Sequence, residues 1–166
     1  MFFGIAMQGP PGARFTLTEI IHDYDVAKNE STLRVPEAQL ATPKDRYHSL
    51  SYSIYYSFPG HVPSPPTDVK FELVTVVKAR QLNTDLYVVF VVDGKEIHYS
   101  SNRSAIKDPV PGKPWIGERM VFLIPRDDFM KMAKAKKLGV KLGGVSFDFT
   151  EDARMAVGAM AATIKN

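Results

Sequence analysis

Side chains with acid–base or metal-binding chemistry are few in this chain and lie far apart in the sequence. It contains four histidines and no cysteine, which excludes disulfides, Cys nucleophiles and thiolate metal sites. No H-x-H, H-x-x-x-H or H-E-x-x-H spacing occurs, so a metal site would need ligands from distant segments. Local spacing therefore predicts no catalytic residue, no metal ligand and no cofactor.

The segment HDYD places His22 beside Asp23 and Asp25, and His48 follows the segment KDRY. These residues leave one enzymatic alternative open, which is a His/Asp site assembled in space from His22, Asp23 or His48. That alternative requires at least two of the three side chains to converge in a pocket. Isolated His and Asp side chains are more often solvated, so an exposed strand or loop is favoured for HDYD.

The stretch KLGVKLGGVSFDFTEDAR, residues 137–154, resembles a phosphate-binding loop at first sight. Gly139 and Gly144 have the glycine spacing of such a loop, and Ser146 occupies the hydroxyl position. The lysine position, however, is Val145, and the residues that follow alternate in polarity and do not begin a helix. A phosphate site is therefore disfavoured.

A β-hairpin with Gly143-Gly144 as its turn explains the same stretch better, because Gly-Gly suits a type I′ turn. This register pairs apolar residues on one face: Leu142 with Val145, Val140 with Phe147, and Leu138 with Phe149. Thr150 then caps a helix over residues 151–164, whose first turn carries Glu151 and Asp152.

A run of lysines precedes this hairpin and offers a weak anion-binding site. The candidate residues are Lys134, Lys136, Lys137 and Lys141. Carboxylates flank the run, and no aromatic residue is interleaved for base stacking. With a net charge of only +3, the sequence favours a solvated face here and predicts no specific nucleic-acid partner.

Residues 47–58, YHSLSYSIYYSF, alternate in polarity over twelve positions and predict a strand with one buried face. The other face would carry Tyr47, Tyr55 and a row of serines. Tyrosine gives contact area at low entropy cost, and serine adapts its hydrogen bonds. Tyr47 and Tyr55 are therefore candidate contacts for a protein partner, with cover by another sheet as the structural alternative.

Trp115, in GKPWIGE, follows a proline-rich stretch. We expect its ring to pin a long loop to the core, and contact with a ligand is the second interpretation.

Further strands are predicted over 69–77 and 118–125, and a hairpin over 86–100 turns at Asp93-Gly94. A short helix is predicted near 127–135 with Asp127 as its cap, whereas residues 16–29 suit helix or strand, with extended structure favoured. The chain should be one mainly β domain, α+β at most, over residues 1–166. We expect an antiparallel β-sandwich or curved sheet of about seven to nine strands. No apolar run approaches a membrane span.

The order of elements over residues 67–164 resembles a β-rich module of uncharacterised bacterial secreted proteins and lipoproteins. The resemblance rests on the Asp-Gly hairpin, ERMVFLIP, AKAKKLGVKLGG and FDFTEDA with its closing helix. It implies no known activity and a cell-envelope location, although the opening residues MFFGIAMQGPPGA lack signal-peptide features. The predicted function is a non-catalytic binding or accessory module of a bacterial cell envelope. The sequence sets no oligomeric state.

Overall fold

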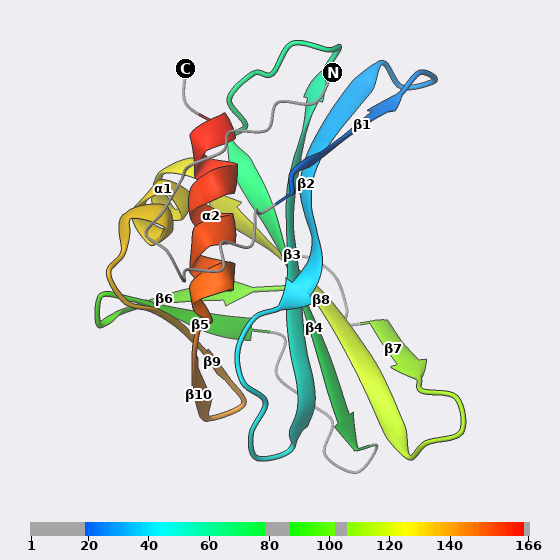
Figure 1. The fold of residues 1–166 in the computed structure, drawn as a ribbon, viewed down its shortest axis with the longest axis vertical. Coiled ribbons are helices and arrows are strands. Elements are labelled where there is room, and N and C mark those ends of the chain that lie inside the picture. The colour runs from blue at the N-terminus through cyan, green and yellow to red at the C-terminus, as the bar shows by residue number, and fades with distance from the viewer. Residues whose placement is uncertain (1–18, 79–86, 102–105, 165–166) are drawn as a thin grey trace, which may run out of the picture.

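The computed structural model describes residues 19–78, 87–101 and 106–164 of the chain. In these residues two antiparallel sheets and two helices form (Figure 1). The elements in chain order are β1 Ile21–Asp25, β2 Glu30–Gln39, β3 Tyr47–Pro59, β4 Asp68–Lys78, β5 Tyr87–Val92, β6 Lys95–Ser100, β7 Ile106–Pro109, β8 Trp115–Pro125, α1 Arg126–Lys134, β9 Leu138–Leu142, β10 Val145–Asp148 and α2 Glu151–Thr163.

The larger sheet has six strands in the order β1-β2-β3-β4-β8-β7, and the smaller one has four in the order β10-β9-β5-β6. The predicted mainly β, antiparallel two-sheet fold is thus confirmed. The described residues hold slightly more strands than expected, because no strand was predicted over β2 or β7, and both join the large sheet.

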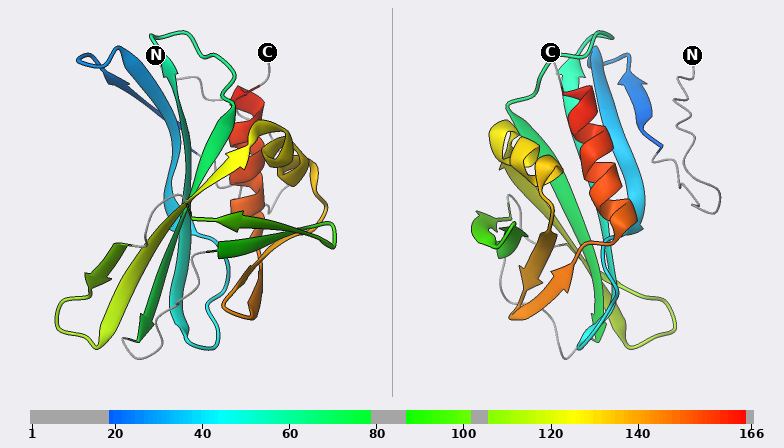
Figure 2. Two further views of the ribbon diagram at one scale, coloured as in Figure 1. Left: turned by 180° about the vertical axis from the view of Figure 1, so that it is seen from behind. Right: turned by 60° about the vertical axis from the view of Figure 1, so that its left-hand side comes forward.

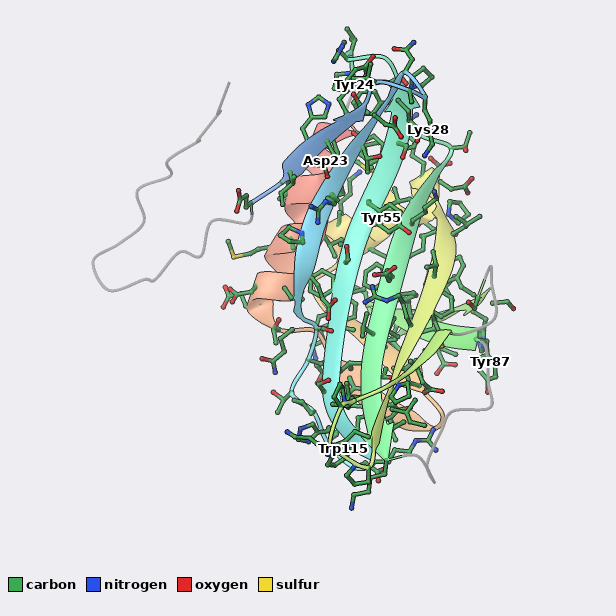
Figure 3. All side chains as sticks on the ribbon, turned by 90° about the vertical axis from the view of Figure 1, so that its right-hand side faces the viewer. Asp23, Tyr24, Lys28, Tyr55, Tyr87 and Trp115 are labelled. Carbon is green, nitrogen blue, oxygen red and sulfur yellow. The ribbon has the colours of Figure 1, made fainter. Side chains whose placement is uncertain are left out.

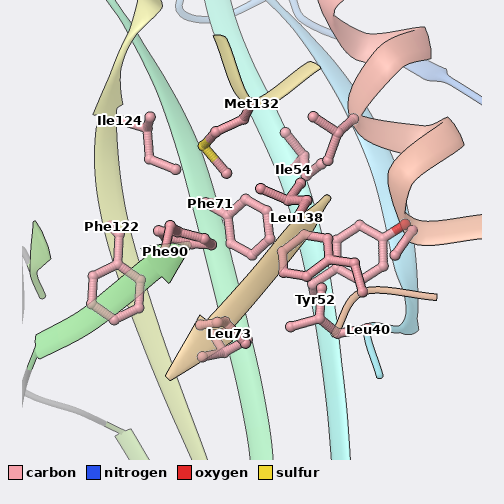
Figure 4. Close-up of a cluster of buried hydrophobic side chains, with 14 of the residues drawn as sticks. Leu40, Tyr52, Ile54, Phe71, Leu73, Phe90, Phe122, Ile124, Met132 and Leu138 are labelled. Carbon is pink, nitrogen blue, oxygen red and sulfur yellow. The ribbon is translucent and has the colours of Figure 1, made fainter. Parts of the chain in front are cut away.

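One face of the large sheet is buried against α1, α2 and the small sheet (Figure 2). Alternate residues of β3, β4 and β8 supply this face, as the polarity pattern requires. Phe71 lies at its centre among side chains of both sheets, including Tyr52 and Phe90 (Figure 4). Tyr56 Oη contacts Thr163 Oγ1 at 3.1 Å and so joins α2 to β3.

The stretch that resembled a phosphate loop is the predicted hairpin. Its register pairs Val145 with Leu142 and Phe147 with Val140. Gly143 and Gly144 have φ of 48° and 84°, the left-handed values that a type I′ turn needs. Gly139 is required for a different reason, since a Cβ there would lie 2.8 Å from the Phe147 carbonyl oxygen.

The helix predictions are confirmed in position, but only one of the two capping predictions holds. Thr150 caps α2 by accepting a hydrogen bond from the Ala153 N–H at 3.1 Å. Asp127, in contrast, lies inside the first turn of α1, and Pro125 occupies the N-cap position without a side-chain bond. The capping prediction for Asp127 was wrong because α1 begins at Arg126, two residues before the start of a helix that Asp127 would cap.

The ambiguous segment near the start forms a strand where the structure describes it. β1 pairs with β2 from Ile21 to Asp25, and the chain then turns through Asn29 at a φ of 50°. The preference for extended structure is confirmed for these residues, whereas residues 16–18 lie outside the described part of the chain.

Candidate functional site

The face of the large sheet that points away from the core is its most distinctive surface. The described helices and the small sheet all lie on the opposite side, so this face is in front in Figure 3. We call it the open face and define it by the outward residues of three strands. They are Ser49, Ser51, Ser53, Tyr55 and Ser57 of β3, Lys70, Glu72, Val74, Val76 and Lys78 of β4, and Trp115, Gly117, Arg119, Val121 and Leu123 of β8.

The open face carries an apolar band beside its serines. A sheet with one solvated face normally alternates apolar-in and polar-out. Here four outward aliphatic side chains, all half-buried, interrupt that rule: Val74, Val76, Val121 and Leu123. Ser51 pairs with Val74 across the strands, so small hydroxyls lie directly beside this band. The result is a surface of mixed polarity on a twisted sheet (Figure 2).

The carboxylates on this surface are already paired. Arg119 forms ion pairs with Glu72 of β4 and with Glu37 of β2, the second at 3.7 Å. Ser51 Oγ also donates to Glu37 Oε1 at 2.7 Å. The more exposed of the two pairs, Arg119–Glu37, is of the kind that contributes only about 0.2–1 kcal/mol to folding, whereas Glu72 is largely buried. The main effect of both pairs here is to neutralise the acidic groups of the face.

A shallow recess opens beside the serines where β2 departs from regular pairing. The register of β2 with β3 shifts between Val35 and Ala38, which is the mark of a β-bulge. The recess is lined by Glu37, Ala38, Gln39, Pro43, Ser49, Leu50 and Ser51. Its carboxylate, amide and hydroxyl groups suit a hydrogen-bonding group of a partner.

Trp115 lies on the open face at the end where β3 begins and β4 ends (Figure 3). Its ring stacks on His48 with centroids 4.4 Å apart, and Lys78 Nζ lies 5.7 Å from its centroid. The expectation that Trp115 pins a loop to the core is therefore wrong. As the first residue of β8 it packs on outward side chains of β3 and β4.

The two tyrosine candidates lie on opposite sides of the sheet. Tyr55 is on the open face, with Lys70 Nζ 5.4 Å from its ring centroid. Tyr47 is only 3% exposed, its ring meets Phe147 edge-on, and its hydroxyl donates to the Leu142 carbonyl at 3.2 Å. The predicted outward position of Tyr47 was wrong because a register shift between Tyr47 and Ser49 breaks the alternation.

The lysine candidates do not form one site. Lys134, Lys136 and Lys137 are exposed at the end of α1 and after it. Lys141 instead lies on β9, where it is paired with Glu96. The hydrogen bond and charge of Lys141 lower the pKa of the Glu96 carboxyl. Only three of the four lysines therefore lie together.

The histidine and aspartate candidates are not brought together. His22 packs against the Phe58 ring, whereas Asp23 accepts a hydrogen bond from Arg34 Nε at 2.8 Å. Through β2, His22 lies opposite Tyr56, which is eight residues along β3 from His48. At about 3.4 Å per residue that separation is roughly 27 Å. The described residues also hold no group of His, Cys, Asp or Glu that could bind a metal ion.

Sequence reasoning missed a buried polar group on the core side of β8. Glu118 is 1% exposed and accepts a hydrogen bond from the buried Thr75 hydroxyl at 3.5 Å. Nearby, Arg46 donates to the Gly143 carbonyl at 3.3 Å, and its hydrogen bond with Tyr47 raises the pKa of its guanidinium. The signal was available, because Glu118 is in phase with the buried Met120 and therefore has to face inward.

Comparison of the chain with protein-family models, with characterised proteins and with solved structures finds no match. Within the described ranges, no helix has the length and apolar character to cross a membrane.

Proposed function

We propose that the protein is a non-catalytic binding module that docks a protein partner on the open face of its large sheet. The observation that carries the proposal is the apolar band of this face on β4 and β8, which lies beside the small serines of β3 and surrounds Glu72, a carboxylate that Arg119 already neutralises. A partner gains apolar burial there without leaving that carboxylate unpaired.

The size of the open face is compatible with a specific interface. From Ser49 to Ser57 the face runs eight residue steps, or roughly 27 Å along β3. Four neighbouring strands, β2, β3, β4 and β8, add a width of about 15 Å at the usual strand spacing. This area is about 400 Å², so it can form the centre of a standard interface of ~800 Å² per partner, with the residues around it supplying the rest.

The histidine and aspartate candidates do not meet in one pocket of the described structure, and this supports the non-catalytic part of the proposal. Among the described residues, His22, Asp23 and His48 remain apart, and the buried Glu118 lies on the core side of the sheet. The aromatic residues and serines of the open face lie on strands, which hold them in fixed positions for contact with a partner.

We also propose that the module works in a bacterial cell envelope. Support for this part comes from the resemblance of residues 67–164 alone. Fractionation of cells that carry the complete natural gene tests it, and the expected result is that the protein sediments with the envelope or is exported. Recovery wholly in the cytosol would overturn it.

Site-specific photo-crosslinking tests the docking face. A photoreactive benzoylphenylalanine replaces Ser53 on the open face, and in the control it replaces Ser146, which is exposed on the outward side of the small sheet. In cells with the natural gene, we expect a discrete protein adduct at position 53 and none of that mass at position 146.

The captured protein is then purified and its affinity measured directly. Val121→Glu should weaken binding at least tenfold, because a charge replaces the centre of the apolar band. Val91→Glu is a control on the outward side of β5, where the side chain is also half-buried. Identical adducts at positions 53 and 146, or equal effects of the two valine changes, would contradict the proposal.

A further inference from the structure

One end of the open face gathers cationic and aromatic side chains from separate segments. His48 comes from the bulged start of β3, Lys78 from the end of β4, and Trp115 from the start of β8. Lys78 is the direct cross-strand partner of Trp115. We call this group, together with Lys113, the cationic end.

Lys113 belongs to the cationic end because it lies in the turn before β8, and backbone hydrogen bonds close this turn next to Trp115. The Val110 N–H donates to the Trp115 carbonyl at 3.0 Å, and the Lys113 N–H donates to the Val110 carbonyl at 3.1 Å. Lys113 is exposed and lies two residues before Trp115. The turn therefore holds a second lysine near the aromatic stack.

Charges are distributed unevenly over the open face. The carboxylates of Glu37 and Glu72 are both paired with Arg119. Neither Lys78 nor Lys113 has a carboxylate partner among the described residues, and both are exposed. The face thus has its acidic groups neutralised, one half-buried lysine, Lys70, over the Tyr55 ring at the far end, and two exposed cations together at this end. Electrostatic complementarity therefore favours a negatively charged ligand at the cationic end.

We infer that the partner of the open face presents an acidic polypeptide segment to the cationic end. The segment lies along the serines and valines, with carboxylates at Lys78 and Lys113. This inference rests on the proposed function and names the chemistry of the partner. Lysine ammonium groups that keep part of their hydration form ion pairs of moderate strength, so the contact steers and orients the partner.

A polypeptide fits this surface better than a nucleic acid does. The Trp115 ring already stacks on His48, so that ring face is covered, whereas single-stranded nucleic acids need open aromatic platforms. Beyond the cationic end, the face continues as serines and aliphatic side chains, which offer a phosphate backbone few partners.

Fluorescence provides a direct readout, since Trp115 is the single tryptophan of the chain. The purified full chain is titrated with poly-L-glutamate at low salt, and calorimetry measures the same affinity independently. We expect a saturable change of Trp115 emission that weakens at least tenfold in the double variant K78E/K113E. The control K134E/K136E changes the same number of exposed lysines and should lose less than twofold.

Three outcomes would overturn the inference. They are no saturable binding of poly-L-glutamate by either method, an equal loss in both double variants, and tighter binding of a (dT)20 oligonucleotide than of poly-L-glutamate. The last outcome assigns the cationic end to nucleic acid. Circular dichroism of each variant confirms that the fold is retained.

The same variants separate this inference from the docking proposal. One outcome is that the partner captured at position 53 fails to bind Val121→Glu and still binds K78E/K113E. In that case the open face is the docking surface, and the inference of an acidic segment at the cationic end is wrong. If Val121→Glu leaves that partner bound, the docking proposal itself fails.

Discussion

The two faces of the large sheet are made by the same strands and differ in almost every physical respect. On the core face, β3 presents large side chains such as Tyr52 and Ile54, which are at most 1% exposed. On the open face the same strand presents serines, which are only half-buried by their neighbours. One backbone thus carries a packed interior and an outward surface of small side chains, and the alternation of residue size separates the two.

The largest contrast should appear in folding stability. Phe71 is fully buried and its ring lies 5.1 Å from the Phe90 ring and 5.8 Å from the Tyr52 ring. Phe71→Ala should lower the free energy of unfolding by about 3–5 kcal/mol, because a cavity remains at the centre of the core. Val121→Ala, on the open face, should cost less than about 1 kcal/mol. Urea unfolding of both variants measures the difference, and equal losses would erase the distinction between the faces.

A residue that points away from the core can still be sensitive to substitution. Gly139, on the outward side of β9, shows this for the small sheet. Gly139→Ala should destabilise the protein by about 1–3 kcal/mol, because the new Cβ lies 2.8 Å from a backbone oxygen. Gly158→Ala in α2 meets no atom within 4 Å and should stabilise by about 0.5–1 kcal/mol. Thermal unfolding compares the pair, and a neutral or stabilising Gly139→Ala would show that β9 shifts freely.

Alkaline pH probes the buried tyrosine of the core face. Burial raises the pKa of Tyr52 on the core face from 10.0 to about 12. Between these values the unfolded chain loses a proton that the folded chain keeps, so stability falls as pH rises through this window. At pH 11 the loss from Tyr52 is about 1.4 kcal/mol relative to pH 9.

The difference in unfolding free energy between the wild type and Tyr52→Phe, measured from pH 9 to pH 11, tests this effect. We expect the wild type to lose more stability than the variant by that amount. Tyr55→Phe on the open face serves as the control. If the unfolding free energy of Tyr52→Phe changed with pH in parallel to that of the wild type, the Tyr52 phenol would have the same pKa in the folded and the unfolded chain.

The smallest effect is expected for the ion pairs of the open face. As side chains, Arg119 is 39% exposed but Glu72 only 15% exposed, so Arg119→Gln should lower the free energy of unfolding by about 1 kcal/mol, at the upper end of the range for exposed pairs. That loss should shrink further in about 1 M NaCl, where the Debye length is near 3 Å. A larger and salt-independent loss in chemical unfolding would mean that Arg119 holds the sheet together, contrary to its assignment to a contact surface.

Local patterns predicted the strands and hairpins because their causes are local. The pairing of Val140 with Phe147 follows from the apolar phase around Gly143-Gly144, and the Asp93-Gly94 turn follows from its need for positive φ. Thr150 was recognised as a cap because a hydroxyl before an acidic first turn has few other roles.

The candidate site was predicted less well, and the reason is one bulge. The alternation over residues 47–58 assigned Tyr55 correctly to the outward face, but the register shift after Tyr47 turned that side chain into the core. A bulge is fixed by how a strand fits its partner strand, so alternation within one strand does not reveal it. The position of Trp115 beside His48 depends on the same pairing of distant strands.

The sequence by itself thus determined most of the strands, where the hairpins turn and which side chains face inward along most of each of those strands, but it did not reveal β2 or β7. Periodicity and turn chemistry act within a few residues and can be read from one segment. Only the tertiary structure decided that β8 lies beside β4, that helices and the small sheet cover one face alone, and that Lys78 meets Trp115. Those choices depend on the packing of segments far apart in the chain, since each sheet face is buried only where another element fits it.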